Sequence, residues 1–160
     1  MALQSEIFEV TVTCSRVLLQ MSNINQILDV GHTRARFKAC FTEGSLYFHG
    51  ALLKRNENYE FIFSKSKQRE LGLSAHQSFQ LQLFEDTSKY GVEMPEEMEA
   101  VLLTYPLALE RFDVLPEGFR RSLIYTLIRI KDVQKRVDKA LLLCENLKRG
   151  NRDRKTVFSD

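Results

Sequence analysis

The first half of the chain alternates apolar and polar residues, which is the pattern of half-buried β-strands. In FEVTVTC, every second residue from Phe8 to Cys14 points to one face of such a strand. The same alternation recurs in RARFKACF (34–41), SLYFHGALL (45–53), NYEFIFS (58–64) and SFQLQLF (78–84). Residues 1–90 are therefore predicted to form a β-domain of short strands.

Turn signals and short helical segments separate these strands. Glu43-Gly44 suits a hairpin turn, and Gly50 inside a strand pattern predicts a bulge or sharp bend. SNINQILDV and SKQRELGL each predict one or two helical turns, with Ser22 and Ser66 as N-caps. Residues 18–41 resemble residues 61–84 in this strand–helix–strand pattern. The resemblance predicts an internally duplicated unit that closes into a small barrel.

The period changes in the second half, where apolar residues recur every three or four positions. Each of the three prolines precedes such a stretch, and proline suits the first helical position. The four predicted helices begin at or near Pro95, Pro106, Pro116 and Asp132, which is a potential N-cap, and the last ends before Gly150. A helical domain over residues 91–150 is followed by a polar tail, residues 151–160, which is expected to be frayed. Within it, Val157-Phe158 could dock.

Composition is that of a globular protein of 160 residues, with 44% hydrophobic and 28% charged residues. The net charge of +2 is too small to indicate a nucleic-acid or membrane partner. Its distribution is uneven, because residues 91–117 carry seven acids and one arginine, whereas residues 118–155 carry twelve bases and four acids. The two segments either pair with each other or form partner surfaces, and pairing is the simpler reading.

Three cysteines (Cys14, Cys40 and Cys144) occur at wide spacing, without a CxxC motif. They predict free, mostly buried thiols in a reducing compartment. Neither a signal-peptide pattern nor an apolar run of about 20 residues occurs, so a cytoplasmic protein with no membrane insertion is expected.

Catalytic and metal-binding patterns are sparse. The histidines, His32, His49 and His76, lack a second ligand at metal-binding spacing, and no nucleotide-binding or hydrolase motif occurs. Cys40 and His49 supply a thiol and an imidazole as a candidate nucleophile and base, but nothing in the strand pattern activates the thiol. We expect no enzymatic activity, no metal and no cofactor.

The helical half contains motifs that resemble a known family. The Pro-Glu start at residues 95–96, the FRRSLIYTLI helix and the closing KRVDKALLLCENLKRG are similar to the YdeI or OmpD-associated family of bacteriocin-protection proteins. The preceding residues resemble the domain of unknown function that often lies before it. That resemblance implies a double-split β-barrel like those of AbrB and MazE regulators. The expected fold is therefore α+β, a small duplicated barrel followed by a bundle of about four short helices.

Three functions stay open at this level. The resemblance implies a bacterial stress-tolerance protein that acts through an unknown protein partner. The first alternative is a nucleic-acid-binding regulator that uses the basic face of the last two helices and the AbrB-like barrel, although the sequence shows no aromatic stacking platform. A small-molecule binder or enzyme, with its site in the cleft between barrel and bundle, is the second. The candidate interaction surface consists of basic residues: Arg120, Arg121, Arg129, Lys131, Lys135, Arg136, Lys139, Lys65, Lys67 and Arg69.

Overall fold

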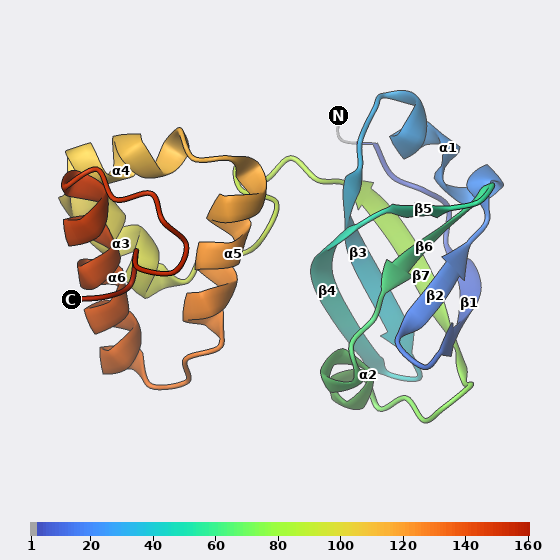
Figure 1. Ribbon diagram of the computed structural model, residues 1–160. Coiled ribbons are helices and arrows are strands. Elements are labelled where there is room, and N and C mark those ends of the chain that lie inside the picture. The colour runs from blue at the N-terminus through green and yellow to red at the C-terminus, as the bar shows by residue number, and fades with distance from the viewer. Residues whose placement is uncertain (1–2) are drawn as a thin grey trace. The chain divides into compact units, whose positions relative to one another are not determined.

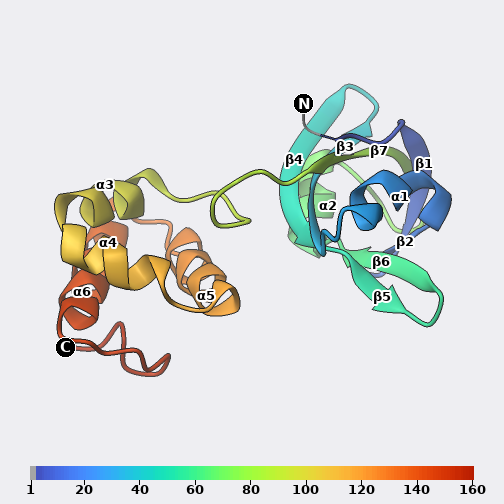
Figure 2. The same cartoon turned by 90° about the horizontal axis from the view of Figure 1, so that it is seen from above.

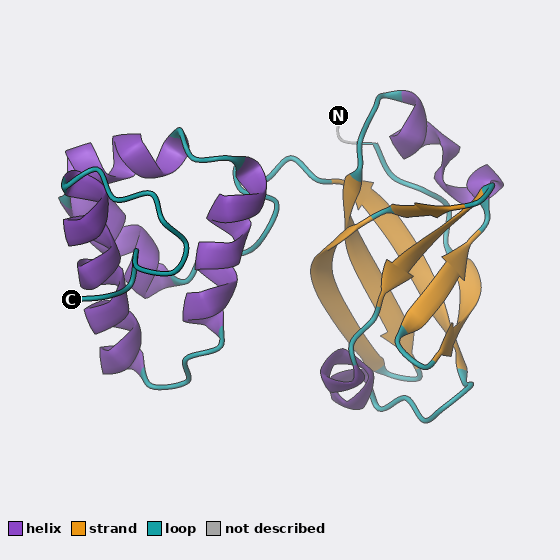
Figure 3. Ribbon diagram, viewed as in Figure 1, coloured by secondary structure: helices purple, strands orange, loops and turns teal. Residues whose placement is uncertain are grey.

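The computed structural model describes residues 3–160 and divides the chain into two compact units, Met1–Gly91 and Val92–Asp160. The first unit contains the strands and the second is helical (Figure 1, Figure 3). The described residues form seven strands and six helices, so the predicted α+β class is confirmed.

The first unit contains the five predicted strand segments and has helices at the two predicted positions. It adds one strand that was not predicted, Arg16–Leu19, and the predicted strand 45–53 is divided at Leu52. Its elements are β1 (Phe8–Thr13), β2 (Arg16–Leu19), α1 (Met21–Asp29), β3 (Arg34–Phe41), β4 (Gly44–Ala51), β5 (Leu53–Arg55), β6 (Asn58–Ile62), α2 (Lys65–Leu71) and β7 (Ser78–Glu85).

The strands form one antiparallel sheet in the order β4-β3-β7-β1-β2-β6-β5. Its first and last strands, β4 and β5, are consecutive in the chain and are separated only by Leu52. One bent segment therefore supplies both ends of the sheet, and the sheet curls into a barrel-like form (Figure 2). Helices α1 and α2 lie at opposite ends of the curled sheet (Figure 1).

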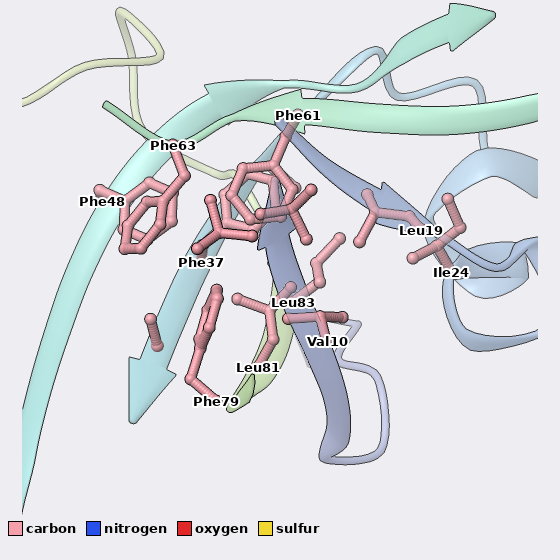
Figure 4. Packing of buried hydrophobic residues seen from close by; sticks show 14 of the residues in the cluster. Val10, Leu19, Ile24, Phe37, Phe48, Phe61, Phe63, Phe79, Leu81 and Leu83 are labelled. Carbon is pink, nitrogen blue, oxygen red and sulfur yellow. The ribbon is translucent and has the colours of Figure 1, made fainter. Parts of the chain in front are cut away.

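Phenylalanine rings fill the interior of the curled sheet (Figure 4). The ring centroid of Phe37 lies 4.9 Å from that of Phe48 and 4.4 Å from that of Phe61. Phe63 stacks on Phe79 at 5.2 Å. Burying each such side chain stabilises the fold by about 1.5–3 kcal/mol, because apolar surface leaves water. The alternation read from the sequence thus selects the inner face correctly.

Two turns differ from the expectations. Cys14 was expected on the inner face of a strand, but it is exposed in the turn after β1 with φ of 58°. The chain reverses there to pair β1 with β2, which ends the alternation. The β3–β4 turn is Thr42-Glu43 rather than Glu43-Gly44, because Phe41 still pairs with Gly44.

Gly50 produces no bulge, contrary to the prediction. It pairs with Ala35 in an uninterrupted β3–β4 register. A Cβ atom at this position would lie 3.0 Å from Cε2 of Phe37. The glycine therefore gives the Phe37 ring room in the core, and packing rather than backbone bending explains it.

Both predicted serine caps are wrong by two residues. Helix α2 is capped by Ser64, whose side chain accepts a hydrogen bond of 3.2 Å from the amide of Lys67, and Ser66 lies inside the helix. Helix α1 starts after Gln20, which makes no side-chain cap, and Ser22 is a helical residue. At α2, two serines two residues apart satisfy the same sequence pattern, and the end of the preceding strand selects between them.

The second unit contains the four predicted helices: α3 (Glu96–Thr104), α4 (Pro106–Asp113), α5 (Glu117–Ile128) and α6 (Val133–Lys148). Asp132 is the predicted N-cap of α6 and accepts a hydrogen bond of 2.9 Å from the amide of Lys135. Gly150 follows the helix with φ of 84°, the left-handed conformation expected after a helix end. These capping predictions are confirmed.

Helix α6 is the centre of the second unit, because α3, α4 and α5 all contact it. The guanidinium of Arg111 in α4 donates to the carbonyls of Leu147 and Lys148. Those carbonyls have no partner inside the helix and carry the negative end of its dipole. A cation at this position therefore stabilises the end of α6.

The tail is packed, so the expectation of a frayed end is wrong. Val157 is fully buried. The side-chain amide of Asn146 in α6 donates hydrogen bonds of 2.8 Å to the carbonyls of Val157 and Ser159. Asn146 is itself buried, which makes these bonds part of the core of the second unit.

Candidate functional site

Three of the predicted basic residues have partners within the helical unit. Arg136 on α6 forms an ion pair of 3.1 Å with Glu97 on α3, and both side chains are mostly buried. Arg120 donates to the carbonyl of Asp113, next to the end of α4. Arg121 lies 3.8 Å from Glu117 one turn earlier in α5, a surface pair of small energetic value. The acidic segment at residues 93–99 therefore does pair with the basic one, through Glu97 and Arg136.

The remaining basic residues of this unit stay accessible to solvent. Arg129, Lys131, Lys135 and Lys139 are all exposed. The side chains of the first three make no ion pair with any residue in the described range 3–160. The charge of this part of the surface is thus available to a partner.

A hollow of about 310 Å³ lies beside α6, lined by Ile130, Lys135, Asp138, Lys139 and Leu142. Four of these residues follow the three-to-four-residue spacing of one helix face, and Ile130 precedes the helix. The ammonium of Lys139 lies 3.5 Å from the carbonyl of Phe158. Gln134 donates a hydrogen bond of 2.9 Å to Asp138. The hollow therefore combines apolar side chains with two ammonium groups and one carboxylate, and that carboxylate accepts a hydrogen bond from Gln134.

The other three predicted residues belong to α2 in the first unit. Lys65 and Arg69 are exposed. The ammonium of Lys67 lies 5.6 Å from the ring centroid of Phe48, a cation–π contact that closes one end of the aromatic core. Lys67 therefore has a packing role. Lys65, Lys67 and Arg69 all belong to the first unit, whereas the other predicted basic residues belong to the second.

Two histidine–carboxylate pairs were not predicted. His49 on β4 has its Nδ1 atom 2.8 Å from Oδ2 of Asp86, and the Asp86 side chain is only 5% exposed. His32 has its Nε2 atom 2.8 Å from Oε1 of Glu85. The two carboxylates are adjacent in the chain at the end of β7. Their partners are 37 and 53 residues away in sequence, so only the strand order brings the pairs together.

Both carboxylates are held in the ionised form. Burial by itself raises the pKa of Asp86, but hydrogen bonds from Ser88 and His49 outweigh it, and the pKa lies below its usual value. The pKa of Glu85 is lowered chiefly by the hydrogen bond to His32 and also by the amide of Leu3. These pairs fasten the end of β7 to neighbouring segments.

The geometry offers no nucleophile–base pair at Cys40. Cys40 pairs across the sheet with Ser45, whereas His49 pairs with Arg36. Four residues of extended strand separate the two positions, about 13 Å. Cys144 is buried, and burial raises the pKa of its thiol to about 11. Among residues 3–160, no group of three His, Cys, Asp or Glu side chains is placed to hold a metal ion. No helix in that range is long and apolar enough to span a membrane.

Comparison with known protein families gives a match over the helical segment of the chain. Residues 91–150 match the family described as Bacteriocin-protection, YdeI or OmpD-Associated. The match covers α3 to α6 and therefore includes the hollow beside α6, and it confirms the resemblance predicted from residues 94–150. No curated protein and no solved structure matched the chain.

Proposed function

We propose that this chain is a cytosolic bacterial protein without enzymatic activity, whose helical unit binds a partner protein and so contributes to bacteriocin or stress tolerance. The family match of residues 91–150 supports this, because the family is described by a cellular outcome and not by a reaction. The hollow beside α6 is the observation that carries the proposal, since it joins apolar surface to the ammonium groups of two lysines, which outnumber its single carboxylate.

The chemistry of the hollow defines the partner segment. Ile130 and Leu142 offer apolar contacts, and Lys135 and Lys139 flank them with ammonium groups. An acidic segment with apolar residues at helical spacing would complement both features. Charge pairs at the rim add speed and selectivity to association, whereas the buried apolar contacts supply most of the affinity.

A comparison of three tagged baits in lysate of the source bacterium tests the proposal. The baits are the wild type, Lys135→Glu with Lys139→Glu, and a control with the exposed Lys54→Glu and Lys155→Glu. The two double variants have the same net charge, so a non-specific electrostatic loss would affect both. The lysate is treated with nuclease before capture, and retained proteins are identified by mass spectrometry.

A protein retained by the wild type and the control, but not by the variant at residues 135 and 139, is expected. Calorimetry with the purified partner should then show at least tenfold weaker binding to that variant, equivalent to about 1.4 kcal/mol. A partner that binds all three baits equally would place the interface elsewhere. Failure of every bait to retain a protein would contradict the proposed function.

We also propose that the first unit is an internally duplicated double-split barrel of the AbrB and MazE type. The segments β2-α1-β3 and β6-α2-β7 repeat the same order, and equivalent strands pair with each other, β2 with β6 and β3 with β7. The hairpin turns before β2 and β6 both begin with a left-handed residue, Cys14 at φ 58° and Asn56 at φ 57°. These correspondences support an approximate twofold axis through the unit.

A further inference from the structure

The outer face of β3 carries a row of cations. Arg34, Arg36 and Lys38 alternate with the buried residues Ala35 and Phe37, so their side chains leave the sheet on the same side. Successive members of the row are about 6.6 Å apart along the strand. Arg34 donates a hydrogen bond of 3.1 Å to the carbonyl of Gly91, whereas Arg36 is exposed and Lys38 is half-buried.

An exposed tyrosine lies beside these cations. Tyr47 on β4 pairs directly with Lys38, and its side chain is 49% exposed. The guanidinium carbon of Arg36 lies 4.7 Å from the Tyr47 ring centroid, and the ammonium of Lys38 lies 5.5 Å from it. The cations hold the ring in place on the sheet surface. The sequence pattern did not reveal this exposed aromatic ring beside the cations.

The nearby acids do not neutralise this row. Neither Arg36 nor Lys38 forms an ion pair with a residue in the described part of the chain. Asp86, the carboxylate next to the row, accepts hydrogen bonds from His49 and Ser88. The positive charge of Arg36 and Lys38 is thus available for an external anion.

We propose that this face of β3 and β4 binds single-stranded nucleic acid, with phosphates at Arg36 and Lys38 and a base stacked against Tyr47 or the guanidinium on it. Lys and Arg neutralise phosphates and release their counterions. A base adds a flat aromatic surface that an acidic peptide lacks, and stacking on a tyrosine tolerates any base sequence. The site lies in the first unit and does not depend on the function proposed for the helical unit.

Fluorescence anisotropy with labelled 16-nucleotide single strands of mixed sequence, DNA and RNA, tests this site. The full-length protein is expected to bind at 50 mM salt and to lose about sevenfold in affinity at 200 mM, the slope for two phosphate contacts. Tyr47→Ala should weaken binding at least fivefold, and Tyr47→Phe should restore it, because stacking needs the ring and not the hydroxyl. Arg36→Gln should reduce the loss between the two salt concentrations to about two- to threefold.

Lys54→Gln, at an exposed lysine on β5, is the matched control and should bind like the wild type. The double variant at Lys135 and Lys139 should also bind like the wild type, which separates this site from the hollow beside α6. Circular dichroism melting curves establish that each variant is folded. The proposal is overturned if no binding occurs at 50 mM salt, if Tyr47→Ala and Arg36→Gln bind normally, or if a poly-glutamate peptide competes as well as the single strand.

Discussion

Single residues in this chain often serve packing where their type suggests another use. Gly50 lies in a regular strand and makes room for the Phe37 ring. Arg136 belongs to the basic segment, yet it holds α6 to α3 through Glu97. Glu85 and Asp86 lie at the end of a strand and bind histidines from distant segments. The role of each residue depends on a neighbour that is remote in sequence.

The Asp86–His49 pair predicts a pH dependence of stability. The pKa of Asp86 is lowered in the folded state, so this carboxylate becomes protonated at a higher pH in the unfolded chain than in the folded one. The stabilisation is therefore complete above the ordinary pKa of an aspartate and is lost as the pH falls through the lower folded value. In Asp86→Asn, the free energy of unfolding should vary less between about pH 5 and pH 3.

Urea denaturation followed by circular dichroism measures this difference. At pH 7, Asp86→Asn should be less stable than the wild type by about 1–3 kcal/mol, since it weakens a buried charge-assisted hydrogen bond. Glu57→Gln, at an exposed turn residue, is the control and should follow the wild-type pH profile. Parallel pH profiles for Asp86→Asn and the wild type would contradict the assignment.

At the scale of elements, helices α2 and α6 each begin at a residue whose side chain caps the first turn. The side chains of Asp132 and Ser64 each accept a hydrogen bond from the backbone amide three residues later in the chain. That amide has no carbonyl partner within the helix. The ends of β2 and β6 set where α1 and α2 can begin. Element existence is therefore a property of the pattern, whereas an element boundary depends on the preceding strand.

The two serines near α2 allow a direct test of the boundary. Ser64→Ala removes the cap and should destabilise the first unit by about 1 kcal/mol. Ser66→Ala should be neutral or slightly stabilising, because alanine is the better helix former at an exposed helical position. Thermal or urea unfolding of the two variants distinguishes the caps, and an equal effect at both positions would contradict the assignment to Ser64.

At the scale of the whole molecule, the chain consists of two compact units with separate cores. The tail belongs to the second, through the buried Val157 and the two hydrogen bonds of Asn146. Because the cores are separate, damage to one should leave the local stability of the other unchanged.

Val157→Asp tests this coupling. It places a charge without a partner in a core and should destabilise the second unit by several kcal/mol, roughly 3 or more. Hydrogen exchange measured by mass spectrometry should show faster exchange in α6 and unchanged exchange in β3 and β7. Lys155→Asp, two residues earlier and exposed, is the control and should exchange like the wild type. Unchanged exchange in α6 would show that the tail is not part of the core.

Much of the candidate surface was visible in the residue types, but its composition was not. Lys135 and Lys139 were identified from sequence and do line the hollow beside α6. Arg120 and Arg136 were identified in the same way, but they bind groups inside the unit. Sequence pattern identifies a cation, whereas only the distance to its partners shows whether the cation is free.

The α+β class, five strand segments, the helices and most of the inner-facing positions follow from local periodicity in the sequence, and short motifs in residues 94–150 carry the resemblance to the matched family. Only the tertiary structure decided the sheet order, the histidine–carboxylate pairs, the row of cations beside Tyr47 and the docking of the tail. Each of these joins residues that are far apart in the chain, and their proximity depends on how the strands and helices pack rather than on any local propensity.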